Sequence, residues 1–313
     1  MKPLLSKYTE TVFRTLARAE AGDQRLTRRD EKLVLRLLNE QLSEADTPLP
    51  PITNLELMIS EDCNLRCDYC FVQTKRPASM SKGIGEKAAD FLIKASGDRK
   101  DIGFLFFGGE PLLGFKTITH IVEYAEKRAA EVEKRVHFSI TTNGTLLTES
   151  VLQFFKDHKV SILLSIDGNA EVHDKHRKTR NGKGSFSLIA KNFDLILKYF
   201  PDMEVRITPH PDTSGNLLES VRFLAEVGFN RFIIGAVHGM EWPDRTHEIY
   251  EQQMVEVIRF RQSLIEQGKT FHLTTLEGGP ITCSFGCRAG AAYAAVAADG
   301  SLAPCSMFLG TPE

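Results

Sequence analysis

From residue 52 onward, short runs of apolar residues alternate with longer stretches in which apolar residues recur every three or four positions. The short runs are rich in β-branched and aromatic residues, which favour strands, whereas the longer spacing is typical of amphipathic helices. The predicted strands are 55–59, 102–107, 137–142, 160–166, 204–208 and 231–236, and the predicted helices lie near 84–96, 116–133, 148–158, 185–199 and 214–227. This alternation indicates parallel βα units and therefore an α/β fold.

A different pattern precedes these units. In residues 1–46, apolar positions such as Val12, Leu16 and Ala19 recur at helical spacing among charges of both signs. The prolines of 47–51 must hold that stretch extended, because each proline fixes its own φ and restricts the residue before it. We expect a helical segment and proline-rich linker over residues 1–50, a domain of βα units over 51–240, and a bridging helix with the start of an auxiliary domain over 241–313.

Three cysteines follow the first predicted strand in the pattern C-x3-C-x2-C: Cys63, Cys67 and Cys70. Thiolates at this density are soft ligands that zinc and iron–sulfur clusters select. Three ligands leave one position of a four-coordinate site open, which is a catalytic arrangement. A structural zinc site needs four closed ligands, and no Cys or His follows Cys70 until His120. A structural disulfide is less favoured still, because nothing marks the chain as secreted.

Further motifs follow the later predicted strands, at the edge where loops build the active site of a βα barrel. They are Gly108-Gly109-Glu110-Pro111, Thr141-Thr142-Asn143-Gly144, and Ser165-Ile166-Asp167-Gly168 with His173 and Arg177 after it. Paired glycines let backbone approach a ligand closely. A tight strand-to-helix turn is the alternative for the glycine motif, and membership of the solvated basic run 175–183 is the alternative for Arg177.

Taken together, these motifs resemble those of the radical S-adenosylmethionine (SAM) superfamily, in particular its peptide-modifying members. The resemblance implies a partial (β/α)6 TIM-like barrel. It also implies a [4Fe-4S] cluster on Cys63, Cys67 and Cys70, whose open iron is chelated by the amino and carboxylate groups of SAM. Electron transfer from the reduced cluster then cleaves SAM, and the resulting 5′-deoxyadenosyl radical abstracts hydrogen from the substrate.

The resemblance also assigns roles in binding SAM. Glu110, within its Gly108, Gly109 and Pro111 motif, contacts the amino group, and Ser165 and Arg177 bind the carboxylate, a task suited to a planar guanidinium. Asp167 belongs to the same motif as Ser165. Asn143 either contacts the ligand or adopts the left-handed conformation before Gly144. Three apolar residues are either adenine contacts or core: Phe71, Val72 and Val237.

A second cysteine group lies near the end of the sequence: Cys283, Cys287 and Cys305. The spacing from Cys287 through Gly300 to Cys305 resembles the opening of the SPASM auxiliary motif and predicts a hairpin with an Asp299-Gly300 turn. The sequence ends at Glu313 before the motif's later cysteines, so we expect a truncated auxiliary domain, with a natural short form as the alternative. Auxiliary [4Fe-4S] clusters are then expected only in a longer chain, and a Cys287–Cys305 disulfide or free thiols are the alternative here.

The resemblance implies a peptide or protein substrate and a reducing donor such as flavodoxin or ferredoxin. Two activities stay open, a peptide maturase that forms thioether or carbon cross-links and an anaerobic sulfatase maturase that forms formylglycine. The second needs a base, for which Glu277 is a candidate, although it is equally a surface turn residue. A hypothesis of another class is a non-catalytic metal-cluster module that binds a partner, and SAM binding separates the two.

The composition excludes further classes of protein. A formal charge of −2 argues against a surface built to neutralise nucleic-acid phosphates. No stretch is long and apolar enough for a membrane span or a signal peptide, and 42% hydrophobic residues suffice for a core. We therefore expect a cytoplasmic enzyme that does not bind nucleic acid or a membrane.

Overall fold

The computed structural model describes residues 51–72, 75–277, 289–290 and 292–309. All of these fall in one unit, Pro51–Glu313. The predicted helical segment 1–46 lies outside the described residues, as do Cys283 and Cys287. The predicted boundary near residue 240 stays a prediction.

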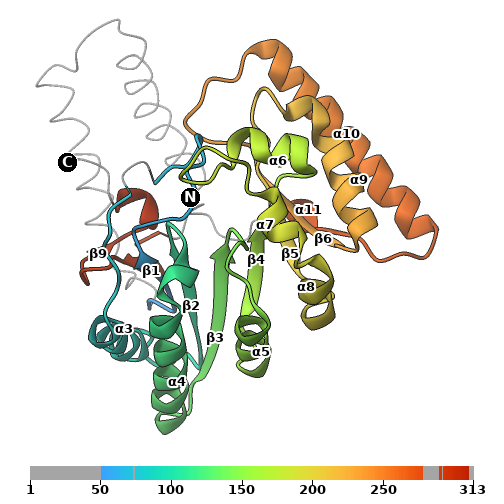
Figure 1. Cartoon of the computed structure of the whole chain (residues 1–313). Coiled ribbons are helices and arrows are strands. Elements are labelled where there is room, and N and C mark those ends of the chain that lie inside the picture. The colour runs from blue at the N-terminus through green and yellow to red at the C-terminus, as the bar shows by residue number, and fades with distance from the viewer. Residues whose placement is uncertain (1–50, 73–74, 278–288, 291, 310–313) are drawn as a thin grey trace, which may run out of the picture. The chain divides into compact units, whose positions relative to one another are not determined.

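A single sheet of nine strands runs through the described part of the chain, in the order β7-β6-β5-β4-β3-β2-β1-β8-β9 (Figure 1). Neighbours from β7 to β1 pair in parallel, as β1 and β8 do, and only β8 and β9 pair antiparallel. The strands are β1 Asn54–Ser60, β2 Asp101–Gly108, β3 Arg135–Thr142, β4 Ser161–Ser165, β5 Glu204–Ile207, β6 Arg231–Ile234, β7 His272–Leu273, β8 Tyr293–Val296 and β9 Leu302–Ala303. The six predicted strands and the α/β class are confirmed.

Helices follow the strands as the parallel pairing requires. They are α3 Lys82–Ala95, α4 Phe115–Glu131, α5 Glu149–Asp157, α6 Ala170–His176, α7 Phe186–Ala190, α8 Phe193–Tyr199, α9 Leu217–Val227, α10 Asp244–Glu266 and α11 Thr274–Glu277, with short 3-10 helices η1 Pro111–Gly114, η2 Ser214–Asn216 and η3 Ser306–Phe308. The predicted helix 185–199 is wrong in one respect, because it is two helices interrupted at 191–192.

Strand β2 shows why these residues form a barrel wall. Ile102, Phe104 and Phe106 alternate along the strand and are buried in the hydrophobic core. Leu105 and Phe107 point to the opposite face and line an internal cavity. A strand places successive side chains on opposite faces, so the pattern separates a helix-covered core from a lined interior.

The end of the described chain adds a hairpin to this sheet. Strands β8 and β9 pair antiparallel, and the turn between them contains Gly300 at φ 92°. Asp299 stabilises the turn by accepting a hydrogen bond from the Ser301 amide at 2.9 Å. The predicted Asp299-Gly300 hairpin is confirmed, whereas the parallel pairing of β8 with β1 was not predicted.

Candidate active site

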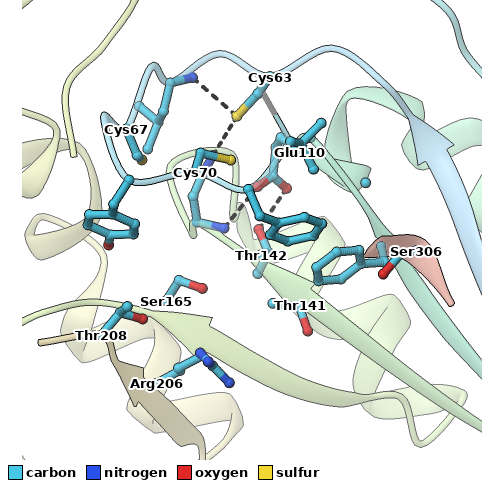
Figure 2. Close-up of a pocket in the computed structure, with 18 of the residues that line it drawn as sticks. Cys63, Cys67, Cys70, Glu110, Thr141, Thr142, Ser165, Arg206, Thr208 and Ser306 are labelled. Carbon is cyan, nitrogen blue, oxygen red and sulfur yellow. Dashed lines mark hydrogen bonds between the residues drawn. The ribbon is translucent and has the colours of Figure 1, made fainter. Parts of the chain in front are cut away.

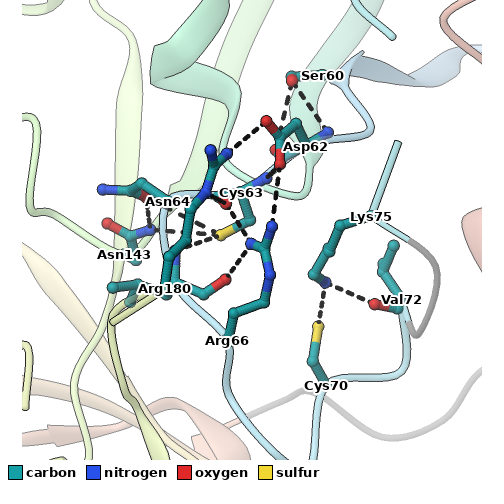
Figure 3. Close-up of polar contacts among 11 residues, drawn as sticks. Ser60, Asp62, Cys63, Asn64, Arg66, Cys70, Val72, Lys75, Asn143 and Arg180 are labelled. Carbon is teal, nitrogen blue, oxygen red and sulfur yellow. Dashed lines mark hydrogen bonds and ion pairs between the residues drawn. The ribbon is translucent and has the colours of Figure 1, made fainter. Parts of the chain in front are cut away.

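The cysteine loop follows β1 and is held in place largely by cations (Figure 3). Two guanidiniums donate to the Cys63 carbonyl, Arg66 at 2.5 Å and Arg180 at 3.0 Å. Both also pair with Asp62. Lys75 donates to the Cys70 sulfur at 3.0 Å. The loop is therefore fixed by side chains from both ends of its own sequence and from the segment after α6.

The glycine pair at the end of β2 packs closely against the start of this loop. A Cβ on Gly108 would lie 2.2 Å from the Ser60 carbonyl, and one on Gly109 would lie 2.3 Å from the Asp62 carbonyl. The Gly109 amide also donates to Ser60 at 2.7 Å. The sequence predicted that these glycines admit a close backbone approach, and the backbone that approaches them is that of the cysteine loop.

Glu110 is fully buried next to this loop (Figure 2). Its carboxylate accepts hydrogen bonds from the amides of Leu112 at 3.0 Å and Asn143 at 2.8 Å and from the Thr142 hydroxyl at 2.7 Å. Burial raises the pKa of Glu110 to about 7 despite these hydrogen bonds. No cation pairs with it among the described residues, so the carboxylate is suited to a positively charged ligand group.

Arg177 and Asp167 form a buried ion pair on the other side of the cavity. Arg177 donates to the two oxygens of Asp167 at 2.6 and 3.1 Å, and the Tyr69 hydroxyl donates to the same carboxylate at 2.7 Å. Burial alone would raise the pKa of Asp167, but the Arg177 guanidinium outweighs it and holds that pKa below its usual range. The alternative that places Arg177 in the solvated run is wrong, since its side chain is 8% exposed, whereas Lys178 is exposed.

The three cysteines, Glu110 and Arg177 line one cavity of about 470 Å³ at the carboxyl ends of the parallel strands (Figure 2). Most of the predicted site residues line it: Cys63, Cys67, Cys70, Phe71, Val72, Gly108, Gly109, Glu110, Asn143, Ser165, Arg177 and Val237. Phe71 stacks on Phe107 with ring centroids 6.0 Å apart. Val237 is buried yet reaches the cavity. The structure thus brings together residues that are up to 174 positions apart, from Cys63 to Val237.

A scan against known families matches residues 57–224 to the Radical SAM superfamily. That match covers more than half of the sequence. The chain belongs to the radical SAM superfamily.

Relatives and solved structures agree with this assignment. A cysteine-type anaerobic sulfatase-maturating enzyme of Clostridium novyi is 31% identical over 180 residues, covering 56% of this chain and 48% of that protein. The structure of anSMEcpe with bound AdoMet matches with a TM-score of 0.70 at 22% identity, over 83% of this chain and 75% of that one. Streptococcus suis SuiB bound to its precursor peptide SuiA gives 0.62 at 14% identity, over 98% and 74%. These likenesses confirm the partial barrel. The chain spans about half the length of the curated relatives it matches.

Radical SAM enzymes use a [4Fe-4S] cluster and SAM, and the donor set fits that cluster. The three thiols are free, which excludes a disulfide among them. One zinc ion with Zn–S bonds of about 2.3 Å would hold its sulfurs about 3.8 Å apart. Among the described residues, the group whose ligand atoms all lie within 4.8 Å is His176, His210 and Asp212, not the cysteines. As the structure places them, the three cysteine sulfurs therefore do not all lie within reach of one metal ion.

Burial makes two of these thiols, those of Cys63 and Cys67, poor anions in the metal-free protein. It raises the pKa of Cys63 and raises the pKa of Cys67 to about 11. A coordinated thiol is deprotonated by its metal, so a bound cluster would supply the missing positive charge. The Leu65 amide, which donates to the Cys63 sulfur at 3.3 Å, would then stabilise a cluster thiolate.

Two site predictions need correction. Glu277 does not line the cavity, and its carboxylate accepts from Arg261 at 2.8 Å and pairs with His272 at 3.0 Å. The Arg261 contact lowers the pKa of Glu277 to about 2, which makes it a weak base and favours the surface-turn alternative. The left-handed alternative for Asn143 is also wrong, because the positive φ falls on Gly144, at 75°, and Asn143 has none.

Asn143 instead connects the third strand to the cysteine loop. Its side-chain amide donates to Asn64 at 2.9 Å, and its side-chain oxygen accepts from the Thr145 amide at 3.0 Å. Its backbone amide binds Glu110, as described above. Asn143 therefore positions two parts of the site at once.

Sequence reasoning missed several residues of this site. Arg180 lies in the basic run 175–183, which reads as solvated surface, yet it donates to the Cys63 carbonyl at 3.0 Å. Tyr69, Lys75 and Arg206 also line the cavity. Tyr69 and Lys75 stand beside the cluster cysteines, and that proximity was an available signal. For Arg206 the sequence held no distinguishing signal, because the same strand also carries Glu204.

A cluster of His176, His210 and Asp212, outside the cavity, contacts the cysteine loop at Asp68. The buried His176 ring lies 2.9 Å from the Asp68 carboxylate through Nδ1 and 2.8 Å from Asp212 through Nε2. His210 contacts the same Asp212 oxygen at 2.6 Å, and Lys175 pairs with the other oxygen at 3.0 Å. Both His176 nitrogens have partners, so this group ties the loop at Asp68 to the end of α6.

Proposed function

We propose that this chain is the catalytic part of a radical SAM enzyme that abstracts hydrogen from a side chain of a peptide or protein. The observation that carries the proposal is the placement of three free thiols, with one ligand position left open, beside the buried Glu110, which pairs with no cation in the described part of the chain. When bound, the cluster and SAM supply a radical able to remove a hydrogen atom from an unactivated carbon. The protein's own residues bind and orient the reactants and keep water out.

The cavity offers a partner for each part of SAM. Glu110 would accept hydrogen bonds from the amino group, because a buried carboxylate without a cation is stabilised by one. Ser165 and the outward N–H groups of Arg177 would bind the carboxylate. Asp167 would orient Arg177 by holding two of its other N–H groups. The role of Asp167 is thus positional, and it is fixed in turn by Tyr69.

Apolar surface in the same cavity suits the adenine ring. Phe71 and Val72 follow the cysteine loop, and Val237 follows β6 on another wall. The exposed face of Phe71 is free to cover a flat ring, because the side chain is 42% exposed and stacks on Phe107 through its other face. These residues would enclose the ligand between two walls of the barrel.

Two substrate classes have support from named relatives. The match to sulfatase-maturating enzymes favours a sulfatase whose active-site Cys or Ser becomes formylglycine. The fold shared with SuiB, solved with its precursor peptide, favours a ribosomally made peptide that receives a cross-link. Both are peptide or protein side chains, and that is the substrate class we propose. With Glu277 held in an ion pair, any base for the first reaction lies elsewhere.

The remaining partners follow from the chemistry. The cluster needs a low-potential electron donor such as flavodoxin or ferredoxin, and we place the enzyme in the cytoplasm, where such donors act. Cys283, Cys287 and Cys305 would contribute to an auxiliary [4Fe-4S] cluster in a longer chain. Within the described part of the chain, no helix has the length and apolar character to cross a membrane.

The proposal is tested by supplying both substrate classes to anaerobically reconstituted protein with SAM and dithionite. One peptide carries a sulfatase active-site Cys or Ser, and the other is a short cysteine-containing precursor. We expect 5′-deoxyadenosine from SAM and a mass change in one peptide. A protein that binds its cluster but neither binds nor cleaves SAM would support the non-catalytic module instead.

A further inference from the structure

Two guanidiniums line the active-site cavity, and their surroundings differ. Arg177 is neutralised by its bidentate contact with Asp167. Arg206 lines the same cavity, but none of the residues that the structure describes forms a hydrogen bond or ion pair with its side chain. A partly buried charge without a partner is costly, and at a functional site it indicates a ligand of opposite charge.

The fold leaves room for this guanidinium and directs it into the cavity. Arg206 lies on β5, where it alternates with the buried Val205 and Ile207. A Cβ at Gly235 on the neighbouring segment would come within 3.3 Å of the Arg206 guanidinium, so the glycine leaves the side chain its space. Burial and repulsion from Arg177 both lower the pKa of Arg206. It nevertheless stays charged at any working pH, as arginine does.

Arg206 is the register partner of Ser165 on the neighbouring strand β4, so it lies next to the expected SAM carboxylate contact and far from the cysteine loop that follows β1. The amino and carboxylate groups of SAM chelate the cluster iron and therefore lie beside the cysteines. Strand β5 is four strands from β1 in the sheet. Figure 2 shows Ser165 between the cysteines and Arg206, with the guanidinium on the far side. A ligand group that reaches Arg206 thus lies beyond Ser165 as seen from the cysteines, on the side of the cavity away from the iron-binding end of SAM.

We propose that Arg206 binds a carboxylate of the substrate, either an acidic side chain near the modified residue or the free C-terminal carboxylate of a peptide. This inference rests on the proposed function and deepens it by making Arg206 a residue that selects the substrate. A guanidinium matches a carboxylate with two parallel N–H donors. The open N–H groups of Arg206 can offer that geometry without breaking any contact in the described structure.

The test is a titration of reconstituted, SAM-loaded enzyme under anaerobic conditions. Three probes are compared by calorimetry: N-acetyl-L-glutamic acid α-amide, with a side-chain carboxylate; N-acetylglycine, with a terminal carboxylate; and N-acetyl-L-glutamine amide, which has neither. The proteins are the wild type, Arg206→Gln, Arg206→Lys, and Arg222→Gln as the control. Arg222 is exposed on α9 and stacks on Phe260, outside the cavity.

We expect one charged probe to bind the wild type and the Arg222→Gln variant more tightly than the neutral probe does. Arg206→Gln should raise the dissociation constant of that probe by about tenfold or more, which is the effect of removing a charged hydrogen-bond partner. Arg206→Lys should raise it by less. The SAM dissociation constant should not change. Which charged probe responds distinguishes an acidic side chain from a chain terminus.

Three results would overturn the inference. The probes could bind Arg206→Gln as well as the wild type, neither charged probe could bind the wild type better than the neutral one, or Arg206→Gln could lose SAM binding itself. The last result would move Arg206 to the SAM site. Failure of the proposed function is a separate outcome, because then the wild-type protein would not bind SAM at all.

Discussion

Glu110 offers the sharpest test of the SAM site, because its ionisation falls in an accessible pH range. Its pKa is raised to about 7 by burial, and its ionised form is the one that attracts an ammonium group. Replacing it by Gln keeps the shape but removes the charge. A hydrogen bond to a charged group contributes about 1.5–3 kcal/mol. Glu110→Gln should therefore raise the SAM dissociation constant roughly 10- to 150-fold at pH 8.

The pH dependence supplies the diagnostic part of this prediction. A carboxyl with a raised pKa is ionised above that pKa and neutral below it, so the advantage of Glu110 is present above pH 7 and is lost as the pH falls through 7. With a pKa of about 7, the ionised fraction falls from about 90% at pH 8 to about 10% at pH 6. The ratio of dissociation constants, variant over wild type, should therefore fall about ninefold over that range.

Isothermal titration of SAM at several pH values measures this ratio. The amino group of SAM itself titrates near pH 8, but it does so equally with both proteins and cancels in the ratio. Glu171→Gln, an exposed position on α6, is the matched control and should behave as the wild type. A ratio that stays constant from pH 6 to pH 8 would refute the assignment of Glu110 to the SAM amino group.

Other parts of the site give independent predictions. Gly109→Ala should lower iron incorporation, measured per chain after reconstitution, because its Cβ would press on the cysteine loop; Gly83→Ala, which has open space around it, should not. Asp167→Asn should lower the free energy of unfolding by about 3–5 kcal/mol in urea, since it leaves a buried guanidinium unpaired, whereas Asp101→Asn on the surface should cost less than about 1 kcal/mol; equal effects would contradict the buried pair. A chain that begins at Pro48 should still cleave SAM in an assay for 5′-deoxyadenosine, and loss of cleavage in a folded protein would place the N-terminal segment in the site.

The sequence was sufficient for the barrel strands because their signal is local. Runs such as 102–107 are short, almost wholly apolar and rich in aromatic residues, and the structure places β2 there. The motif loops were predictable for the same reason, since each directly follows a strand. The interruption between α7 and α8 was not, because a continuous apolar pattern spans 191–192 and hides the break.

Contacts between distant segments account for what the sequence could not give. The exposed Arg180 reads as a solvated charge until the fold brings it to the Cys63 carbonyl, 117 positions away. Glu277 reads as a free carboxylate until α10 supplies Arg261. The parallel pairing of β8 with β1 joins residues more than 200 positions apart. Each of these depends on tertiary geometry, which no local pattern encodes.

The central claim is that Cys63, Cys67 and Cys70 hold the cluster that activates SAM. The most direct measurement is iron content together with 5′-deoxyadenosine formation in anaerobically reconstituted wild type and in a variant with all three cysteines replaced by Ala. We expect the variant to lose about four irons per chain, as a [4Fe-4S] cluster requires, and to form no 5′-deoxyadenosine, whatever iron the other cysteines bind. A triple variant that keeps the full iron content and still cleaves SAM would contradict the account.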